Sequence, residues 1–247
     1  MDIRHETWHS QYLQRDMEFK VYGHAGKPCL VFPCQDGRYF DFENFGMLDY
    51  CQPYIDQGRL KLYAVDSIDK ETWSDSAGAP YDRIRRHEAW FRYVTEELYP
   101  WMMRDAGWSG RAMTLGFSMG AYHAANMLFR RPDLFDTVIA LSGVYDPEQF
   151  MGGYLDEVAY LNSPLVSVRG MHPQDPHIQK LNTCKIILCT GQGAWEELMV
   201  ASTGSMAHAM HEKGIHAWVD FWGHDVSHDW PWWKKQLPYF LDKVMNQ

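Results

Sequence analysis

The sequence predicts a single α/β domain, residues 1–247, with a mostly parallel central sheet and helices on both of its faces. Short apolar runs typical of buried strands alternate along the chain with longer segments of helical periodicity. An apolar content of 46% over 247 residues is enough for one large core and excludes disorder. A serine flanked by two glycines also falls where a predicted strand meets a predicted helix.

In the first half of the chain, strands are expected where short apolar or alternating runs occur. Residues 18–22 alternate and predict a half-exposed strand, whereas the continuous apolar run at 28–33 is typical of a central strand. Residues 60–66 predict the next strand. A polar segment then leads to a long helix, which we expect to be capped by Asp82 and to end near Pro100.

The second half continues this alternation. Strands are predicted at 112–115, 137–142, 185–190 and 217–222, and helices at 119–130, about 196–213 and about 230–245. Residues 146–180 have weak periodicity and several prolines, which indicates an excursion over the strand ends and a candidate part of a substrate pocket. Reactive groups of such sheets gather at the carboxyl ends of the strands.

The strongest chemical signal is Gly116-Phe117-Ser118-Met119-Gly120, which has the pattern G-x-S-x-G. A strand precedes it and a helix follows, the context in which this pattern forms a strained turn that exposes a nucleophilic serine. The two glycines leave room where a Cβ would collide with a neighbouring strand or helix. A glycine-rich turn with an incidental serine is the alternative, and the flanking elements disfavour it.

A nucleophilic serine needs a base that takes its proton and an acid that orients the base. In enzymes with this turn, the acid and then the histidine follow the serine along the chain. The candidates, each just past a predicted strand, are Glu196 and Glu197 in one loop and His224, Asp225, His228 and Asp229 in the other. An acid on a separate loop reaches Nδ1 from the side opposite the serine, which favours Glu196. His228 immediately precedes the closing helix, which favours it over His224.

These motifs resemble those of the Putative esterase family of the α/β-hydrolase fold, and the resemblance runs from about residue 18 to residue 241. The family includes esterase D-like S-formylglutathione hydrolases, enterochelin-esterase-like proteins and the mycobacterial antigen 85 mycolyltransferases. Its H-x-W-x-x-W ending is similar to the segment that starts at His228, which implies that His228 is the base. Residues 192–196 are similar to its Q-G-x-x-D segment and imply Glu196 as the acid, with Glu where many members have Asp.

The loop after residues 28–33 resembles the oxyanion loop of the family, and Gln35 falls at the donor position. The resemblance implies a serine esterase that acts on a small or medium acyl ester, with the backbone N–H groups of Met119 and Gln35 holding the oxyanion. This mechanism needs no metal or organic cofactor. An acyltransferase of the same mechanism and a non-catalytic binding protein on this fold are the alternatives, and the complete set of three residues disfavours the second.

Composition indicates which partners and which cell compartment to expect. A net charge of −9 argues against nucleic acid and anionic membranes as partners, and no apolar run approaches membrane-spanning length. No signal peptide is visible at the N-terminus, and five cysteines without a CxxC pair indicate reduced thiols, so we expect a cytoplasmic protein with a small-molecule ester substrate. Pairs such as His208 and His211 could bind zinc, but no HExxH motif supports a metal site. The sequence carries no signal of oligomeric state.

Overall fold

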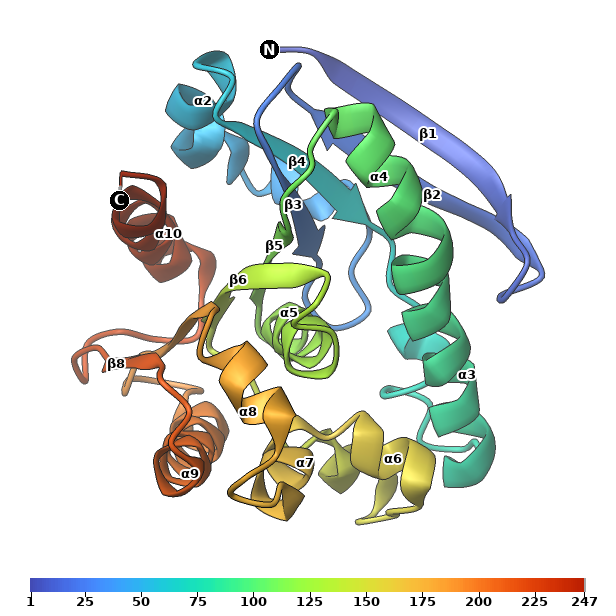
Figure 1. Ribbon diagram of the computed structural model, residues 1–247, viewed down its shortest axis with the longest axis vertical. Coiled ribbons are helices and arrows are strands. Elements are labelled where there is room, and N and C mark those ends of the chain that lie inside the picture. The colour runs from blue at the N-terminus through green and yellow to red at the C-terminus, as the bar shows by residue number, and fades with distance from the viewer. Residues whose placement is uncertain (247) are drawn as a thin grey trace.

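The computed structural model describes residues 1–246, through which one eight-stranded sheet runs (Figure 1). The strands are β1 (Ile3–Ser10), β2 (Arg15–Tyr22), β3 (Lys27–Phe32), β4 (Leu60–Val65), β5 (Ala112–Phe117), β6 (Phe135–Leu141), β7 (Lys185–Thr190) and β8 (Trp218–Phe221). Their order in the sheet is β1-β2-β4-β3-β5-β6-β7-β8. The β1–β2 and β2–β4 pairs are antiparallel, and all other pairs are parallel. The carboxyl ends of β5, β6, β7 and β8 therefore lie at the same edge of the sheet.

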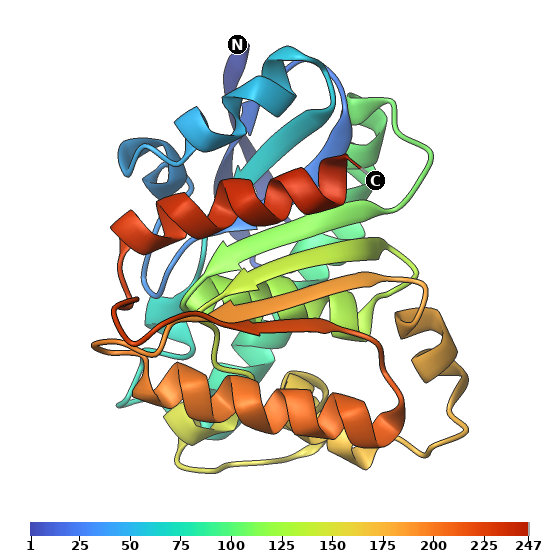
Figure 2. The same cartoon turned by 90° about the vertical axis from the view of Figure 1, so that its left-hand side faces the viewer.

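Helices cover both faces of the sheet (Figures 1 and 2). One face carries α1 (Asp41–Asn44), α2 (Leu48–Asp56) and α10 (Trp230–Met245). The other carries α3 (Pro80–Arg92), a π-helical turn (Tyr93–Leu98), α4 (Tyr99–Ala106), α5 (Met119–Arg130) and α9 (Glu197–Lys213). Shorter elements are two 3₁₀-helices (Asp69–Glu71 and Pro147–Met151), α6 (Glu157–Leu161), α7 (Pro164–Gly170) and α8 (Pro176–Leu181).

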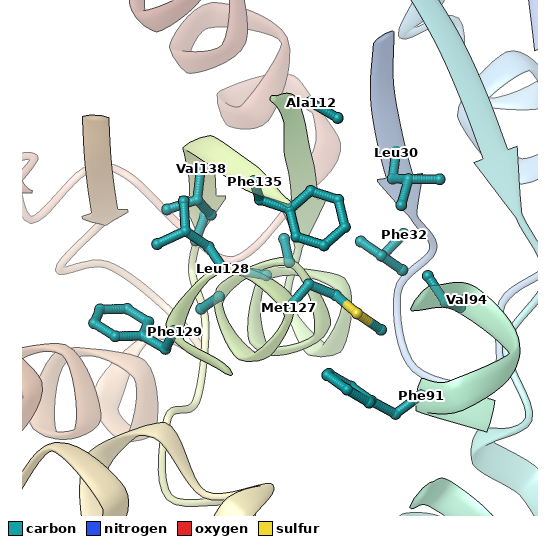
Figure 3. Packing of buried hydrophobic residues seen from close by; sticks show 14 of the residues in the cluster. Leu30, Phe32, Phe91, Val94, Ala112, Met127, Leu128, Phe129, Phe135 and Val138 are labelled. Atoms are coloured by element: carbon teal, nitrogen blue, oxygen red, sulfur yellow. The ribbon is translucent and has the colours of Figure 1, made fainter. Parts of the chain in front are cut away.

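The alternating side chains of the central strands divide the core into two layers. In β3, Leu30 and Phe32 face the layer under α5, whereas Cys29 and Val31 face the layer under α2 and α10. Figure 3 shows Leu30, Phe32, Met127 and Phe135 gathered between α5, β3 and β6. Burial on both faces is the reason that this strand reads as one continuous apolar run rather than as an alternating pattern.

Three expectations from the sequence need correction. The helix begins at Pro80 with Ala79 as its N-cap, not at Asp82, because proline is favoured in the first helical turn. It also continues past Pro100, which lies in the first turn of α4 after the π-helical turn, and the helical run ends at Ala106. Finally, β1 was not predicted, because its side chains are mostly exposed and give no apolar pattern.

The segment 146–180 forms a 3₁₀-helix and three short helices, which explains its weak periodicity. These helices pack against α3, α5 and α9. Three of its four prolines, Pro147, Pro164 and Pro176, lie in the first turns of the helices, where a missing N–H costs nothing, and Pro173 lies in the turn before α8. Within residues 1–246, no helix is long and apolar enough to cross a membrane.

The turn between β5 and α5 is possible only because two glycines permit close backbone contacts. A Cβ on Gly116 would lie 2.0 Å from the carbonyl oxygen of Gly120. A Cβ on Gly120 would lie 2.4 Å from the carbonyl oxygen of Phe32. Real Cβ atoms do not approach backbone this closely, so β3, β5 and α5 meet here at a distance that only glycine allows.

We therefore predict that Gly116→Ala lowers the free energy of unfolding by at least about 3 kcal/mol, the upper end of the usual cost of overpacking. Chemical denaturation measures this loss. The matched control is Gly204→Ala on α9, where an added Cβ meets nothing within 4 Å. That change should stabilise the chain by roughly 0.5–1 kcal/mol because alanine is the better helix former. Equal free energies of unfolding for the two variants would contradict the close contact at the turn.

Candidate active site

Ser118 occupies the turn between β5 and α5 in a backbone conformation that is strained for a residue with a side chain. Its φ is 55° and its ψ is −125°, outside the common regions for L-residues. The turn is fixed by a hydrogen bond that the Ser118 N–H donates to the carbonyl of Leu141, at 2.9 Å. The half-buried serine is thereby held at the edge where the parallel strands end.

His228 lies against Ser118, with 2.9 Å between its Nε2 atom and the Ser118 Oγ atom. It belongs to the loop that joins β8 to α10. The backbone N–H of His228 donates to the carbonyl of Ala194 at 3.0 Å, which ties this loop to the one after β7. The ring of Trp233 meets the imidazole edge-on, with centroids 5.0 Å apart. The backbone bond fixes the loop and the Trp233 ring fixes the imidazole, while the His228 side chain stays 16% exposed.

Glu196 lies behind His228, on the side of the ring away from Ser118. Its Oε2 atom is 3.5 Å from the His228 Nδ1 atom, an ion-pair distance that is longer than a good hydrogen bond. Trp195 adopts a left-handed conformation, with a φ of 69°, directly before it. This turn leaves the indole of Trp195 79% exposed and the side chain of Glu196 only 1% exposed.

Two hydroxyl groups donate hydrogen bonds to the buried carboxylate of Glu196. Ser142 Oγ lies 2.6 Å from Oε1, and Thr190 Oγ1 lies 2.8 Å from Oε2. These bonds give each carboxylate oxygen a partner, without which a buried polar group would be costly. Within residues 1–246, His228 is the one basic side chain within 4.0 Å of this carboxylate. A proton arriving on the imidazole would therefore complete a local ion pair.

The other candidates from the sequence lie elsewhere. Glu197 is exposed in the first turn of α9, and both His224 and Asp225 are exposed in the loop after β8. Asp229 is also exposed, and its side chain caps α10 by accepting the N–H of Trp230 at 2.7 Å. The structure thus brings Ser118, His228 and Glu196 together and places none of the four rivals between them.

The loop that follows β3 passes beside the start of α5. The close contact of Gly120 with the carbonyls of Phe32 and Pro33 fixes this neighbourhood. The side chain of Gln35 donates to Ser74 Oγ at 2.8 Å, which anchors the loop to the segment after the first 3₁₀-helix. Burial, with smaller effects of the Asp41 and Asp69 charges, raises the pKa of the Cys34 thiol to about 12. This thiol is therefore protonated at neutral pH and a poor nucleophile.

Sequence reasoning did not identify the hydroxyl partners of Glu196 or the partner of Gln35. Ser142 and Thr190 each close an apolar strand prediction, at 137–142 and 185–190. A polar residue at the carboxyl end of a parallel strand was the signal that could have found both. Within the described chain, residues 1–246, no three His, Cys, Asp or Glu side chains are grouped so as to hold a metal ion.

Comparison with known proteins assigns the chain to a family. Residues 10–243 match the family model described as Putative esterase. No curated protein matches the chain.

Three solved structures share the fold along nearly its whole length. A ferulic acid esterase is 16% identical with a TM-score of 0.76 (99% of this chain and 98% of that chain covered). An S-formylglutathione hydrolase from Agrobacterium tumefaciens is 15% identical with a TM-score of 0.74 (99% and 94% covered). MPT51 from Mycobacterium tuberculosis is 14% identical with a TM-score of 0.72 (100% and 98% covered). At these identities the likeness establishes the fold, that of the α/β hydrolases, and not the substrate.

Proposed function

The chain belongs to the Putative esterase family and is a serine ester hydrolase, and on this premise we propose that Ser118, His228 and Glu196 are its catalytic triad. The observation that carries the proposal is the 2.9 Å contact between the Ser118 hydroxyl and the His228 Nε2 atom, with a buried carboxylate on the far side of the ring. A nucleophile, its base and an orienting acid need this linear arrangement.

In the proposed reaction, Ser118 Oγ attacks the ester carbonyl carbon while His228 Nε2 takes its proton. The tetrahedral intermediate collapses, and His228 returns the proton to the leaving alcohol, which gives an acyl-enzyme on Ser118. Water then attacks the acyl-enzyme by the same sequence, and the acid and free serine are released. Glu196 holds the imidazole in the correct tautomer and stabilises the imidazolium. The 3.5 Å separation of Glu196 and Nδ1 is consistent with a contact that tightens when the imidazole becomes charged.

The oxyanion of the tetrahedral intermediate would be bound by the backbone N–H groups of Met119 and Gln35. Met119 is the first residue of α5, so its N–H belongs to a helix N-terminus, where negative charge is favoured. Gln35 lies on the loop that the side chain of Ser74 anchors. We propose a small or medium acyl ester as the substrate, as the resemblance to the family implies. The partial exposure of Ser118 at the sheet edge supports access of an ester to its hydroxyl.

Ser118→Ala should remove almost all ester hydrolysis, a loss of at least about 10³-fold in turnover, with folding nearly unchanged. The reason is that no other group at the turn can form the acyl-enzyme. A chromogenic short-chain acyl ester measures turnover, and thermal melting measures the fold. A well-folded Ser118→Ala variant that retains wild-type turnover would rule out this nucleophile.

The two histidines of the loop after β8 should behave differently. His228→Ala should lose turnover by orders of magnitude because it removes the imidazole that contacts Ser118 Oγ. His224→Ala is the matched control, since its side chain is exposed on the same loop, and should retain turnover within a few-fold. An inactive His224→Ala beside an active His228→Ala would reverse the assignment of the base.

The two adjacent glutamates provide a similar test of the acid. Glu196→Gln should lower turnover by about 10³–10⁴-fold with little change in stability, because the amide cannot stabilise the imidazolium. Glu197→Gln should leave turnover near normal and cost roughly 0.3–1 kcal/mol of stability, since only the charge at the N-terminus of α9 is lost. Turnover and melting temperature are measured for both, with Asp225→Asn as a further control. Near-normal turnover in Glu196→Gln with collapse in either of the others would move the acid there.

A further inference from the structure

The indole of Trp233 is connected to the acid of the proposed triad through one serine. Trp233 Nε1 donates a hydrogen bond to Ser142 Oγ at 3.1 Å, and Ser142 Oγ lies 2.6 Å from Glu196 Oε1. All three side chains are buried. The residues come from three separate elements: α10, the end of β6 and the turn before α9.

Chemistry determines which group donates and which accepts in the hydrogen bonds that link Trp233, Ser142 and Glu196. An indole nitrogen can only donate a hydrogen bond, so Ser142 Oγ must be the acceptor in its contact with Trp233. A serine hydroxyl carries one proton, and that proton is then available for Glu196 Oε1. The short 2.6 Å distance fits a hydrogen bond from a hydroxyl to an ionised carboxylate. Trp233 therefore aims the Ser142 hydroxyl at the acid.

Trp233 also contacts the base. Its ring meets the His228 imidazole at an interplanar angle of 84°. The same side chain thus borders His228 directly and reaches Glu196 through Ser142. With Oε1 held by Ser142, the second carboxylate oxygen, Oε2, is the one that faces His228 Nδ1.

The backbone of Ser142 argues against a merely incidental contact. Its φ is 56°, in the left-handed region that favours glycine. Glycine would adopt this conformation without strain, and the position follows directly after β6. A serine here is strained, and the group that distinguishes it from glycine is the side chain that binds Glu196.

We propose that Ser142 and Trp233 are positioning residues for the reaction: together they hold the Glu196 carboxylate aligned behind His228. This inference rests on the proposed triad. Both side chains are buried away from solvent, so their loss should lower kcat without changing KM. Their effect should pass through Ser142, because the Trp233 N–H reaches Glu196 only by way of that hydroxyl.

The test compares Ser142→Gly, Ser142→Ala, Trp233→Phe and the double variant Ser142→Ala/Trp233→Phe in ester hydrolysis and thermal melting. The Ser142 changes should lower kcat by about 10-fold or more, the usual effect of losing a hydrogen bond to a charged group, with KM unchanged. Trp233→Phe removes only a bond to the neutral Ser142 hydroxyl and should lower kcat by a smaller factor, about 5-fold. Ser142→Gly should melt at a higher temperature than Ser142→Ala, because glycine relieves the strain, yet lose as much kcat. The double variant should lose no more kcat than Ser142→Ala alone.

The matched control is Trp90→Phe, which removes an equally buried indole N–H that donates to the Asp66 carbonyl at 3.0 Å. This variant should lose stability and keep its kcat. The NMR chemical shifts of the His228 imidazole should move in the Ser142 and Trp233 variants and stay in place in Trp90→Phe.

Wild-type kcat and unmoved His228 chemical shifts in Ser142→Gly would overturn the positioning role, as would additive losses in the double variant. If Ser118→Ala and Glu196→Gln are inactive in the same assay, that failure leaves the triad intact. Full activity of Ser118→Ala or Glu196→Gln would instead overturn the triad itself. Trp233→Phe and Ser142→Gly give separate readings, so misfolding of one variant does not remove the test.

Discussion

The close backbone contact at the turn between β5 and α5 is the constraint on which the site depends. Gly116 and Gly120 allow β5, α5 and the end of β3 to approach at distances that no Cβ would tolerate. This packing, with the bond from the Ser118 N–H to Leu141, holds Ser118 in a conformation that an isolated chain would avoid. The serine hydroxyl is thereby fixed at the sheet edge, where the loops after β7 and β8 bring Glu196 and His228 to meet it. The strain is local, and the surrounding core over-determines it.

Much of this fold could be predicted from the sequence because buried parallel strands have a strong signature. The apolar runs at 28–33 and 185–190 correspond to β3 and β7, and the closing helix at 230–245 is α10. The failures have physical causes. The strand β1 is a mostly exposed edge strand with no apolar pattern. Pro100 predicts a helix end, but its position in the first turn of α4, after the π-helical turn, tolerates a missing N–H. Both errors concern elements whose form depends on their neighbours rather than on local pattern.

The first contacts of the site were accessible to sequence reasoning, whereas the support around them was not. Chain order after parallel strands brought Ser118, Glu196 and His228 to one edge, and the structure places these side chains together. The hydroxyls of Ser142 and Thr190 and the indole of Trp233 lie far apart in the sequence. Their convergence on Glu196 depends on strand register and on the docking of α10. These residues have ordinary local patterns and become partners only through tertiary structure. A single serine at a strand end does not by itself predict that it binds the Glu196 carboxylate.

The central claim is that the strained turn presents Ser118 as an activated nucleophile. The most direct measurement is peptide mass mapping of the chain after reaction with a fluorophosphonate, which phosphonylates an activated serine and mimics the tetrahedral intermediate. The account predicts a single adduct, on Ser118, that forms in the wild type and is absent from Ser118→Ala. Absence of any adduct in the folded wild type, or labelling of Ser118→Ala at the wild-type rate, would contradict it.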